Sequence, residues 1–325
     1  MRLIPFTDDH RHRWDAFVAT TAQGVFLHSR TFLSYHRDRF NDLSILIEDD
    51  RGRLGAVFPA AQSPVISDQV VSHPGSTYGG LLHESTLQAD EILSMLAAIK
   101  AWYARAGYRS LLYKVVPFHV QRSVAQMDLY ALWRLGGTLV RRDSWNMVDL
   151  TQPRHSSRRH LRNLRNAHKA AVRAAIVDQN SLGDFYAILT DCLMDRHSTR
   201  PVHSIEEMKE LNSLFPDHIQ TWGAYAADGA LIAGVWLFRL GHHCWHSQYI
   251  ASNTVGRQLF AVSLLIESII EQACQAGVRY FSLGASTEKN GAVLNAGLFH
   301  FKSGFGSGSV IQDFYEIDLT GPETL

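Results

Sequence analysis

The chain has 325 residues, 46% of them hydrophobic, and its 31 lysines and arginines balance its 31 aspartates and glutamates. With 19% charged and 10% aromatic residues, the composition excludes a disordered or fibrous protein, and the length predicts two globular domains. The zero formal charge argues against a surface that is basic throughout, so any anion site must be local.

The cysteines and the N-terminus indicate the compartment. Cys192, Cys244 and Cys274 are too scattered for a disulfide framework and favour a reducing environment. The first residues, MRLIPFTDDHRHRWD, lack the apolar stretch of a signal peptide, and Glu267 and Glu271 interrupt the longest apolar segment. We expect a soluble, cytoplasmic protein.

Taken in chain order, the predicted elements occur twice. Residues 43–61 (LSILIEDDRGRLGAVFPAA) and 221–240 (TWGAYAADGALIAGVWLFRL) each predict two strands joined by an Asp/Gly turn. Residues 98–114 and 268–284 each predict a helix, a glycine stop at Gly107 or Gly277, and a strand. The repeat predicts two α/β units with mixed sheets, residues 1–150 and 151–325; two unrelated α/β domains are the alternative.

A basic segment opens the second half. Pro153 and the pair Ser156 and Ser157 predict a break and the start of a helix, on which five basic residues share one face: Arg158, Arg162, Arg165, Lys169 and Arg173. Guanidinium groups match phosphate oxygens, so this face suits a nucleotide-linked substrate. A solvated surface is the alternative, and nucleic-acid binding is a third reading, weakened by the lack of stacking aromatics in the helix.

Two polar, glycine-rich stretches are candidate binding loops. In SHPGSTYGG (Ser72–Gly80), the glycines allow close approach of a ligand, and His73, Ser76, Thr77 and Tyr78 offer polar side chains. The second stretch, residues 283–306, follows a strand and holds four candidates for a site wall: Glu288, Asn290, Asn295 and Lys302. A tight structural turn is the alternative reading of the first stretch.

Other chemistries find little support. His242, Cys244 and His246 share one face of a predicted strand, but no fourth ligand stands at an obvious spacing, so no metal is expected. The sequence lacks the G-x-S-x-G, P-loop and G-x-G-x-x-G motifs of serine hydrolases, P-loop NTPases and Rossmann dehydrogenases.

Seven motifs along the chain carry a family resemblance: SHPGSTYGG, DLYALWR (128–134), RPVHSIEE (200–207), HSQYIAS (246–252), STEKNGAVLNAGL (286–298), FKSGFG (301–306) and DFYEIDL (313–319). With them the chain resembles the FemAB-like branch of the GNAT acyltransferase superfamily. It resembles most the polysaccharide-biosynthesis N-acyltransferases that act on nucleotide-linked amino sugars, such as anthrose N-acyltransferases. The resemblance implies tandem, duplicated GNAT-like domains.

The chain also departs from the family pattern. After HSQYIAS, only Gly256 stands where ordinary GNAT enzymes carry the phosphate-cradling Q/R-x-x-G-x-G/A loop. Before DLYALWR, Val120, Gln121 and Val124 replace a Tyr-His pair and a proline, so no catalytic role is assigned to the segment around His119.

The resemblance implies transfer of an acyl group from acyl-CoA to the amino group of a nucleotide-linked amino sugar for surface polysaccharide such as lipopolysaccharide. His73 and Ser76, assisted by Glu84, are the candidates for amine alignment and proton acceptance, and Lys302 for stabilising negative charge. Ten residues are placed in substrate binding: Thr77, Tyr78, Arg158, Arg162, Arg165, His197, His203, Glu288, Asn290 and Asn295.

Two other functions remain open at this point. One is a FemX-like, aminoacyl-tRNA-dependent transferase acting on a peptidoglycan precursor, and the other is a non-catalytic nucleic-acid-binding protein. The acyl group, the sugar and the oligomeric state are not specified by the sequence.

Overall fold

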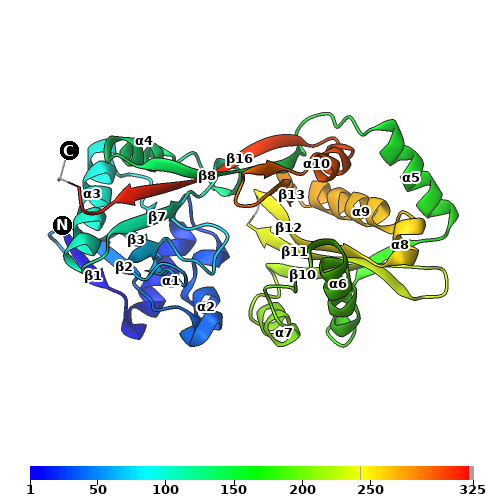
Figure 1. Ribbon diagram of the computed structural model, residues 1–325, viewed down its shortest axis with the longest axis horizontal. Coiled ribbons are helices and arrows are strands. Elements are labelled where there is room, and N and C mark those ends of the chain that lie inside the picture. Colours follow the sequence, from blue (N-terminus) through cyan, green and yellow to red (C-terminus); the bar gives the residue numbers. More distant parts are fainter. Residues whose placement is uncertain (242, 322–325) are drawn as a thin grey trace. The chain divides into compact units, whose positions relative to one another are not determined.

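The computed structural model describes residues 1–241 and 243–321, without the side chains of residues 196 and 197. Contacts divide the chain into two compact units, whose elements are coloured by chain position in Figure 1. The first unit comprises Met1–Asp143, Lys289–Ala292 and Ile311–Leu325, and the second comprises Ser144–Glu288 and Val293–Val310.

The first unit contains a four-stranded sheet, four strands of a ten-stranded sheet and four α-helices among its described residues. Its helices are α1 (Arg11–Thr20), α2 (Arg30–Leu33), α3 (Ala89–Arg105) and α4 (Met127–Arg134). One sheet has the order β1 (Arg2–Pro5), β2 (Ile45–Glu48), β3 (Leu54–Phe58), β6 (Leu82–His83). The other has the order β4 (Ala61–Gln62), β5 (Gln69–Val71), β7 (Ser110–Lys114), β16 (Gly308–Asp318), in which β5 and β7 are parallel.

Helix α3 supplies the centre of the first unit's core. Its apolar residues recur every three or four positions, and Ile92, Leu96, Ile99 and Tyr103 are buried against the strands. This spacing is what places one helical face on a sheet.

The second unit is a mixed sheet with helices on both faces. Its helices are α5 (Arg158–Lys169), α6 (Leu182–His197), α7 (Ile205–Leu214), α8 (Thr254–Gln258), α9 (Ala261–Gln275) and α10 (Ala296–Ser303). The strand order is β8 (Thr138–Asp149), β13 (Tyr280–Ala285), β12 (Cys244–Ser252), β11 (Leu231–Leu240), β10 (Ile219–Tyr225), β9 (Arg173–Ile176). A short hairpin, β14 (Thr287–Glu288) and β15 (Val293–Leu294), precedes α10.

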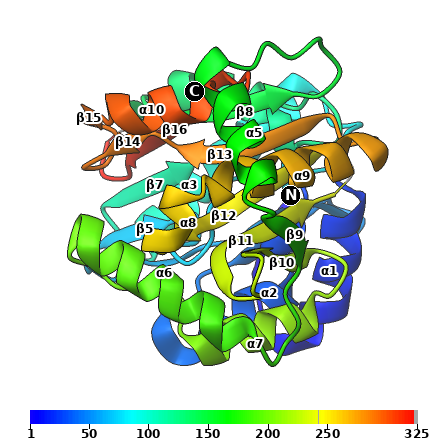
Figure 2. The same ribbon diagram turned by 90° about the vertical axis from the view of Figure 1, so that its right-hand side faces the viewer.

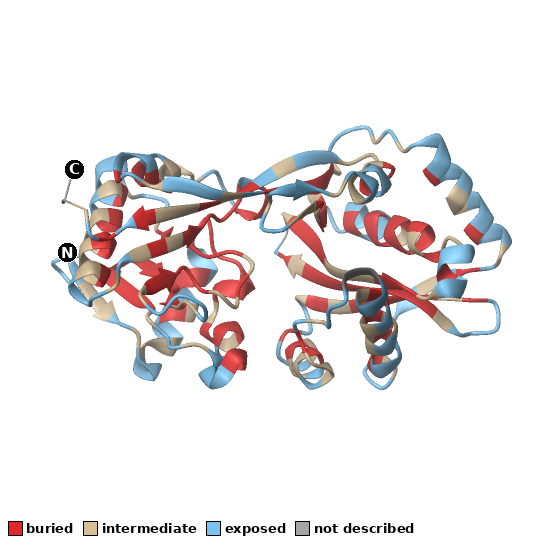
Figure 3. Ribbon diagram, in the orientation of Figure 1, coloured by how far each residue is buried: buried red, intermediate tan, exposed pale blue. Residues whose placement is uncertain are grey.

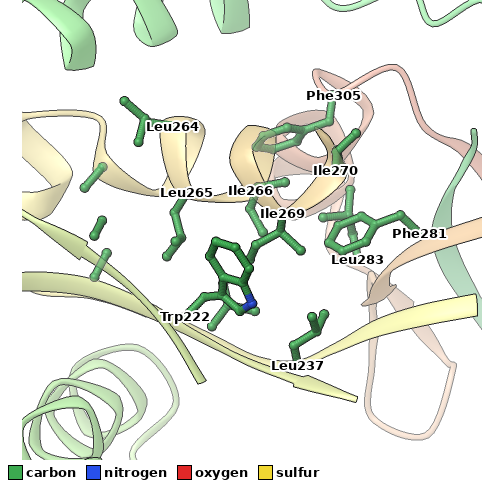
Figure 4. Close-up of a cluster of buried hydrophobic side chains, with 14 of the residues drawn as sticks. Trp222, Leu237, Leu264, Leu265, Ile266, Ile269, Ile270, Phe281, Leu283 and Phe305 are labelled. Carbon is green, nitrogen blue, oxygen red and sulfur yellow. The ribbon is translucent and has the colours of Figure 1, made fainter. Parts of the chain in front are cut away.

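Helices α6 and α9 cover opposite faces of β10–β12, as Figures 1 and 2 show. The core lies under α9, where Leu265, Ile266 and Ile269 pack on Trp222 and Leu237 (Figure 4). None of the helices in the described part of the chain is long and apolar enough to span a membrane.

The predicted repeat is confirmed in both units. Strands β2 and β3 form one antiparallel hairpin and β10 and β11 form the other. Helices α3 and α9 end alike, with Gly107 and Gly277 at φ values of 89° and 70°. The next residue donates its N–H five positions back in each case, Tyr108 to Tyr103 and Val278 to Ala273.

Two long strands, β8 and β16, are each divided between the two units. The second half of β8 pairs with β13, joining Trp145 to Ala285 and Asp149 to Tyr280 in the second unit. The last part of β16 pairs with β7, joining Phe314 to Lys114 in the first unit. The boundaries between the units fall inside both strands, between Asp143 and Ser144 in β8 and between Val310 and Ile311 in β16.

Candidate active site

In the second unit, the parallel strands β12 and β13 pair only at their beginnings. The register joins Cys244 to Tyr280 and His246 to Ser282, and then ends, although β12 continues to Ser252 and β13 to Ala285. Ligands of open α/β sheets bind at the carboxyl ends of parallel strands, where such a separation leaves backbone groups available.

A bulge in β12 lies at the point where this pairing ends. Against β11 the register passes from Trp236–Tyr249 to Leu237–Ser247, which leaves Gln248 as the extra residue. A bulge removes a backbone N–H from the ladder. The Ser247 hydroxyl and the Gln248 side-chain carbonyl are buried and, among the described residues, make no hydrogen bond. Such atoms indicate contact with a ligand or water, so these residues fit a bound substrate.

Lys302 lies at the end of β13. Its Nζ donates to the carbonyl oxygens of Gly284 at 3.1 Å and Ala285 at 2.5 Å, and the side chain is buried. Burial lowers the pKa of Lys302 to about 7, since the charged form loses its water. The group therefore changes charge near neutral pH.

The helix that carries Lys302 is held at its C-terminal end by a buried network. Arg154 donates to Glu267 of α9 and to the Phe305 carbonyl, and His160 Nε2 lies 3.0 Å from Glu267. Burial opposes ionisation of Glu267, but hydrogen bonds from Arg154 and His160 outweigh it and lower the pKa to about 2. These contacts explain how the FKSGFG motif is fixed to α9.

Three of the proposed substrate-binding residues of the second unit have internal partners. His203 Nδ1 lies 2.9 Å from the Tyr249 hydroxyl, which brings the RPVHS and HSQYIAS motifs together. Asn295 donates to Glu288 at 2.6 Å and accepts the Leu298 N–H, so it caps α10. The side chain of His197, at the end of α6, lies outside the described residues.

Helix α5 presents the predicted basic face to solvent. Arg158, Arg162 and Arg165 are exposed, and α5 is pale blue over most of its length in Figure 3. No ion pair engages these three guanidinium groups within the described part of the chain. Arg173 is a correction, because the helix ends at Lys169, Ala171 adopts a φ of 54°, and Arg173 begins β9.

In the first unit, the Ser72–Gly80 loop closes over the carboxyl ends of the parallel strands β5 and β7. The backbone of Lys114, the last residue of β7, binds both ends of the loop. Its N–H donates to the Ser72 hydroxyl at 2.7 Å, and its carbonyl accepts the Gly79 N–H at 3.1 Å. Its Nζ donates to the carbonyls of His73 and Ser76. Burial, and then the charge of Arg141, lower the pKa of Lys114 to about 7.

His73, in this loop, has unsatisfied polar capacity among the described residues. It is buried, its φ is 54°, and its Nδ1 has no hydrogen-bond partner among the described residues. Its ring centroid lies 5.5 Å from that of His36. Burial, and then His36 and Lys114, hold the pKa of His73 well below its usual value, so the imidazole is uncharged at neutral pH.

The other predicted residues of the first unit are placed less favourably. The Ser76 hydroxyl is buried 3.5 Å from the Leu27 carbonyl, Tyr78 is fully buried, and the Thr77 carbonyl accepts from Gln312. Glu84 pairs with Arg53 at 3.0 Å, and within the described residues it shares no hydrogen bond with His73 or Ser76.

The candidate residues thus fall into two groups, one in each unit. Four candidates share the Ser72–Gly80 loop of the first unit: His73, Ser76, Thr77 and Tyr78. Asn290 also belongs to the first unit, outside this loop, and its side-chain oxygen accepts from Arg141 at 3.2 Å. The second group lies in the hairpin and α10 of the second unit: Glu288 is in β14, Asn295 caps α10 and Lys302 is in α10. The arginines of α5 form a separate surface of this unit.

Sequence reasoning missed four residues that organise these groups: Lys114, Tyr113, Asp128 and Gln248. Their roles depend on pairings distant in the chain; only Asp128, inside the DLYALWR motif, and Gln248, inside HSQYIAS, lie in a family motif. No group of three or more potential metal ligands is present in the described ranges.

Comparison with known proteins identifies the fold. Residues 152–303 match the family model described as an acetyltransferase (GNAT) domain, a class that uses acyl-CoA. FemX has a TM-score of 0.68 at 12% identity, covering 98% of this chain and 97% of FemX. No curated protein sequence matches the chain.

Two further solved structures show the same arrangement over nearly the whole chain. L-PGS from Bacillus licheniformis has a TM-score of 0.62 at 10% identity, covering 96% of this chain and 92% of its own. A tandem GNAT protein from the clavulanic acid biosynthesis pathway has a TM-score of 0.55 at 11% identity, covering 99% of both chains. Residues 152–303 thus match a GNAT acetyltransferase domain, the whole chain shares the fold of these tandem structures, and the protein is an acyltransferase.

Proposed function

We propose that the protein transfers an acyl group from acyl-CoA to the amino group of a nucleotide-linked amino sugar used for surface polysaccharide. The observation that carries the acyl-CoA half is the separation of β12 from β13 beside the bulge at Gln248, inside the segment that matches the GNAT domain. The sugar half rests on the SHPGSTYGG, RPVHS and STEKNG motifs, and the exposed arginines of α5 suit its diphosphate.

The contrast between the two units supports acyl-CoA binding in the second. The parallel pair β5 and β7 of the first unit is closed by its own Ser72–Gly80 loop, which makes four hydrogen bonds with Lys114. The corresponding pair in the second unit has no such loop, because β12 is followed by α8. The Ser72–Gly80 loop is accordingly assigned to the acceptor.

The reaction needs an unprotonated amine, alignment and a site for negative charge. The amine nitrogen attacks the thioester carbon, the carbon–sulfur bond breaks, and the nitrogen loses a proton. Backbone N–H groups freed at the bulge, with Lys302 in its charged form, stabilise the developing oxyanion or the leaving thiolate. His73 and Ser76 are the candidates in the acceptor loop for aligning the amine, and the uncharged His73 imidazole is the candidate for accepting its proton.

Thiol release measured over a panel of acyl-CoAs and amino sugar nucleotides tests this function. We expect free thiol only when both substrates are present, with a product heavier than the sugar nucleotide by one acyl group. Turnover of aminoacyl-tRNA with a peptidoglycan precursor, and none of the amino sugars, would instead support the FemX-like activity. Salt-dependent binding of RNA or DNA without any turnover would support the nucleic-acid-binding alternative.

A further inference from the structure

Tyr113, at the centre of the first unit, connects the Ser72–Gly80 loop to a buried carboxylate. Its hydroxyl donates to Asp128 Oδ2 at 2.7 Å and accepts the Leu81 N–H at 2.8 Å. A phenol has one proton, so donation to Asp128 leaves the oxygen lone pairs to the backbone of Leu81. With Asp128 as the acceptor of its proton, the Tyr113 hydroxyl oxygen stays available to the Leu81 N–H.

Gly80, at the end of the loop, packs closely against the Tyr113 side chain. Gly80 has a φ of 84°, and a Cβ added there would lie 2.7 Å from the Tyr113 hydroxyl oxygen. A Cβ on Gly79 would lie 1.9 Å from the Ser72 carbonyl oxygen, so the end of the loop also closes on its beginning. The position of the Tyr113 side chain therefore limits where the Gly80 backbone lies and, through the contact of Gly79 with Ser72, the position of the turn.

Asp128 makes two contacts that an amide cannot reproduce. Besides the Tyr113 hydroxyl, its carboxylate accepts the Leu129 N–H at 2.9 Å through Oδ1. A carboxylate accepts at both oxygens, whereas an asparagine must turn its NH₂ group toward one of these two donors. An asparagine facing Tyr113 with its NH₂ would make the phenol an acceptor and compete with Leu81.

From these contacts we propose that Asp128 is a positioning residue that acts through Tyr113 to fix the Gly80–Leu81 backbone and, with it, the acceptor loop. The inference rests on the proposed function, because it assigns the acceptor to Ser72–Gly80. It adds a residue of α4 that touches no substrate.

The energetics separate this role from simple support of the fold. Asp128 is buried without a cation, and burial raises its pKa to about 6, although the Tyr113 and Leu129 hydrogen bonds oppose the shift. A carboxyl whose pKa rises on folding loses stabilisation as the pH rises through that value, so at pH ~7.5 the ionised group opposes folding.

The experiment compares D128N, Y113F and the double variant with Y103F. Tyr103 is the matched control, since its buried hydroxyl donates to the Leu43 carbonyl at 2.7 Å, with no contact to the loop. For D128N we expect faster amide exchange at Leu81, and an acceptor KM raised about tenfold with an unchanged acyl-CoA KM. Y113F should give the same exchange and KM changes, and the double variant no further change, because both act on one contact.

Exchange and turnover answer separate questions. Amide exchange at Leu81 needs no acceptor, so it decides the positioning role even if no amino sugar nucleotide is turned over, an outcome that would overturn the proposed function alone. Exchange and KM in D128N equal to those of Y103F would overturn the positioning role. A D128N variant that melts lower with unchanged KM would show a structural residue instead.

Discussion

At the scale of single residues, Lys302 offers the sharpest test, because its charge changes near neutral pH. If the charged form stabilises the oxyanion or thiolate, its contribution to kcat should decrease as the pH rises through about 7. Deprotonation of the acceptor amine has the opposite pH dependence. We therefore expect K302A to lower kcat by on the order of 10²-fold, and K302R, which stays charged, to lose the decrease at high pH. The measurement is kcat against pH with both substrates saturating.

K209A is the control for these variants, since Lys209 of α7 is exposed. A merely structural Lys302 would give a K302A protein that melts lower but turns over normally in its folded fraction. K302R with the parent's pH profile would likewise contradict a charge role.

At the scale of elements, α10 is positioned by its connection to α9. Arg154 and Glu267 are both largely buried, with side-chain exposures of 24% and 12%. The E267Q variant leaves Arg154 without its counter-charge and should destabilise the second unit by about 1–3 kcal/mol. Amide exchange across residues 296–306 should rise along with this loss of stability, as measured by mass spectrometry alongside urea unfolding.

E271Q is the control, because Glu271 is exposed one turn further along α9. It should change neither the stability nor the exchange. An E267Q protein as stable as E271Q would mean that the network does not hold α10.

Elements were predictable where short stretches of sequence determine them. The Asp228–Gly229 turn and the stops at Gly107 and Gly277 depend on neighbouring residues, so both hairpins and both helix–strand units followed from the sequence. The division of β8 and β16 between the units did not, because an alternating strand pattern sets which face is buried but not which strand is its neighbour.

The candidate site followed the same division. Motifs found Lys302 and the Ser72–Gly80 loop, whereas Lys114 and Tyr113 gain their roles from hydrogen bonds that span about thirty to forty positions. Burial also decides the charge of Lys302, His73 and Asp128, and sequence alone does not record the depth of a side chain.

At the scale of the whole molecule, the buried imidazoles of the first unit should make it sensitive to acid. Burial lowers the pKa of His28 to about 3 and of His119 to about 4, and it also lowers the pKa values of His73 and His83. Each imidazole takes up a proton more readily in the unfolded chain. The stability of the first unit is therefore complete above pH ~6.5 and is lost as the pH falls toward about 4. The raised pKa of Asp128 has the opposite effect on stability, but it is one group, whereas four histidines have lowered pKa values.

Amide exchange followed separately in peptides of each unit, from pH ~7.5 to ~4.5 after correction for intrinsic rates, measures this dependence. We expect protection in the first unit to fall by several-fold or more across this range, and H119Q to reduce the dependence, because its amide does not titrate. H300Q, at an exposed position of α10, is the control in the second unit. Protection in the first unit that stays constant with pH, or falls equally in H119Q and the parent, would show that these imidazoles do not limit its stability.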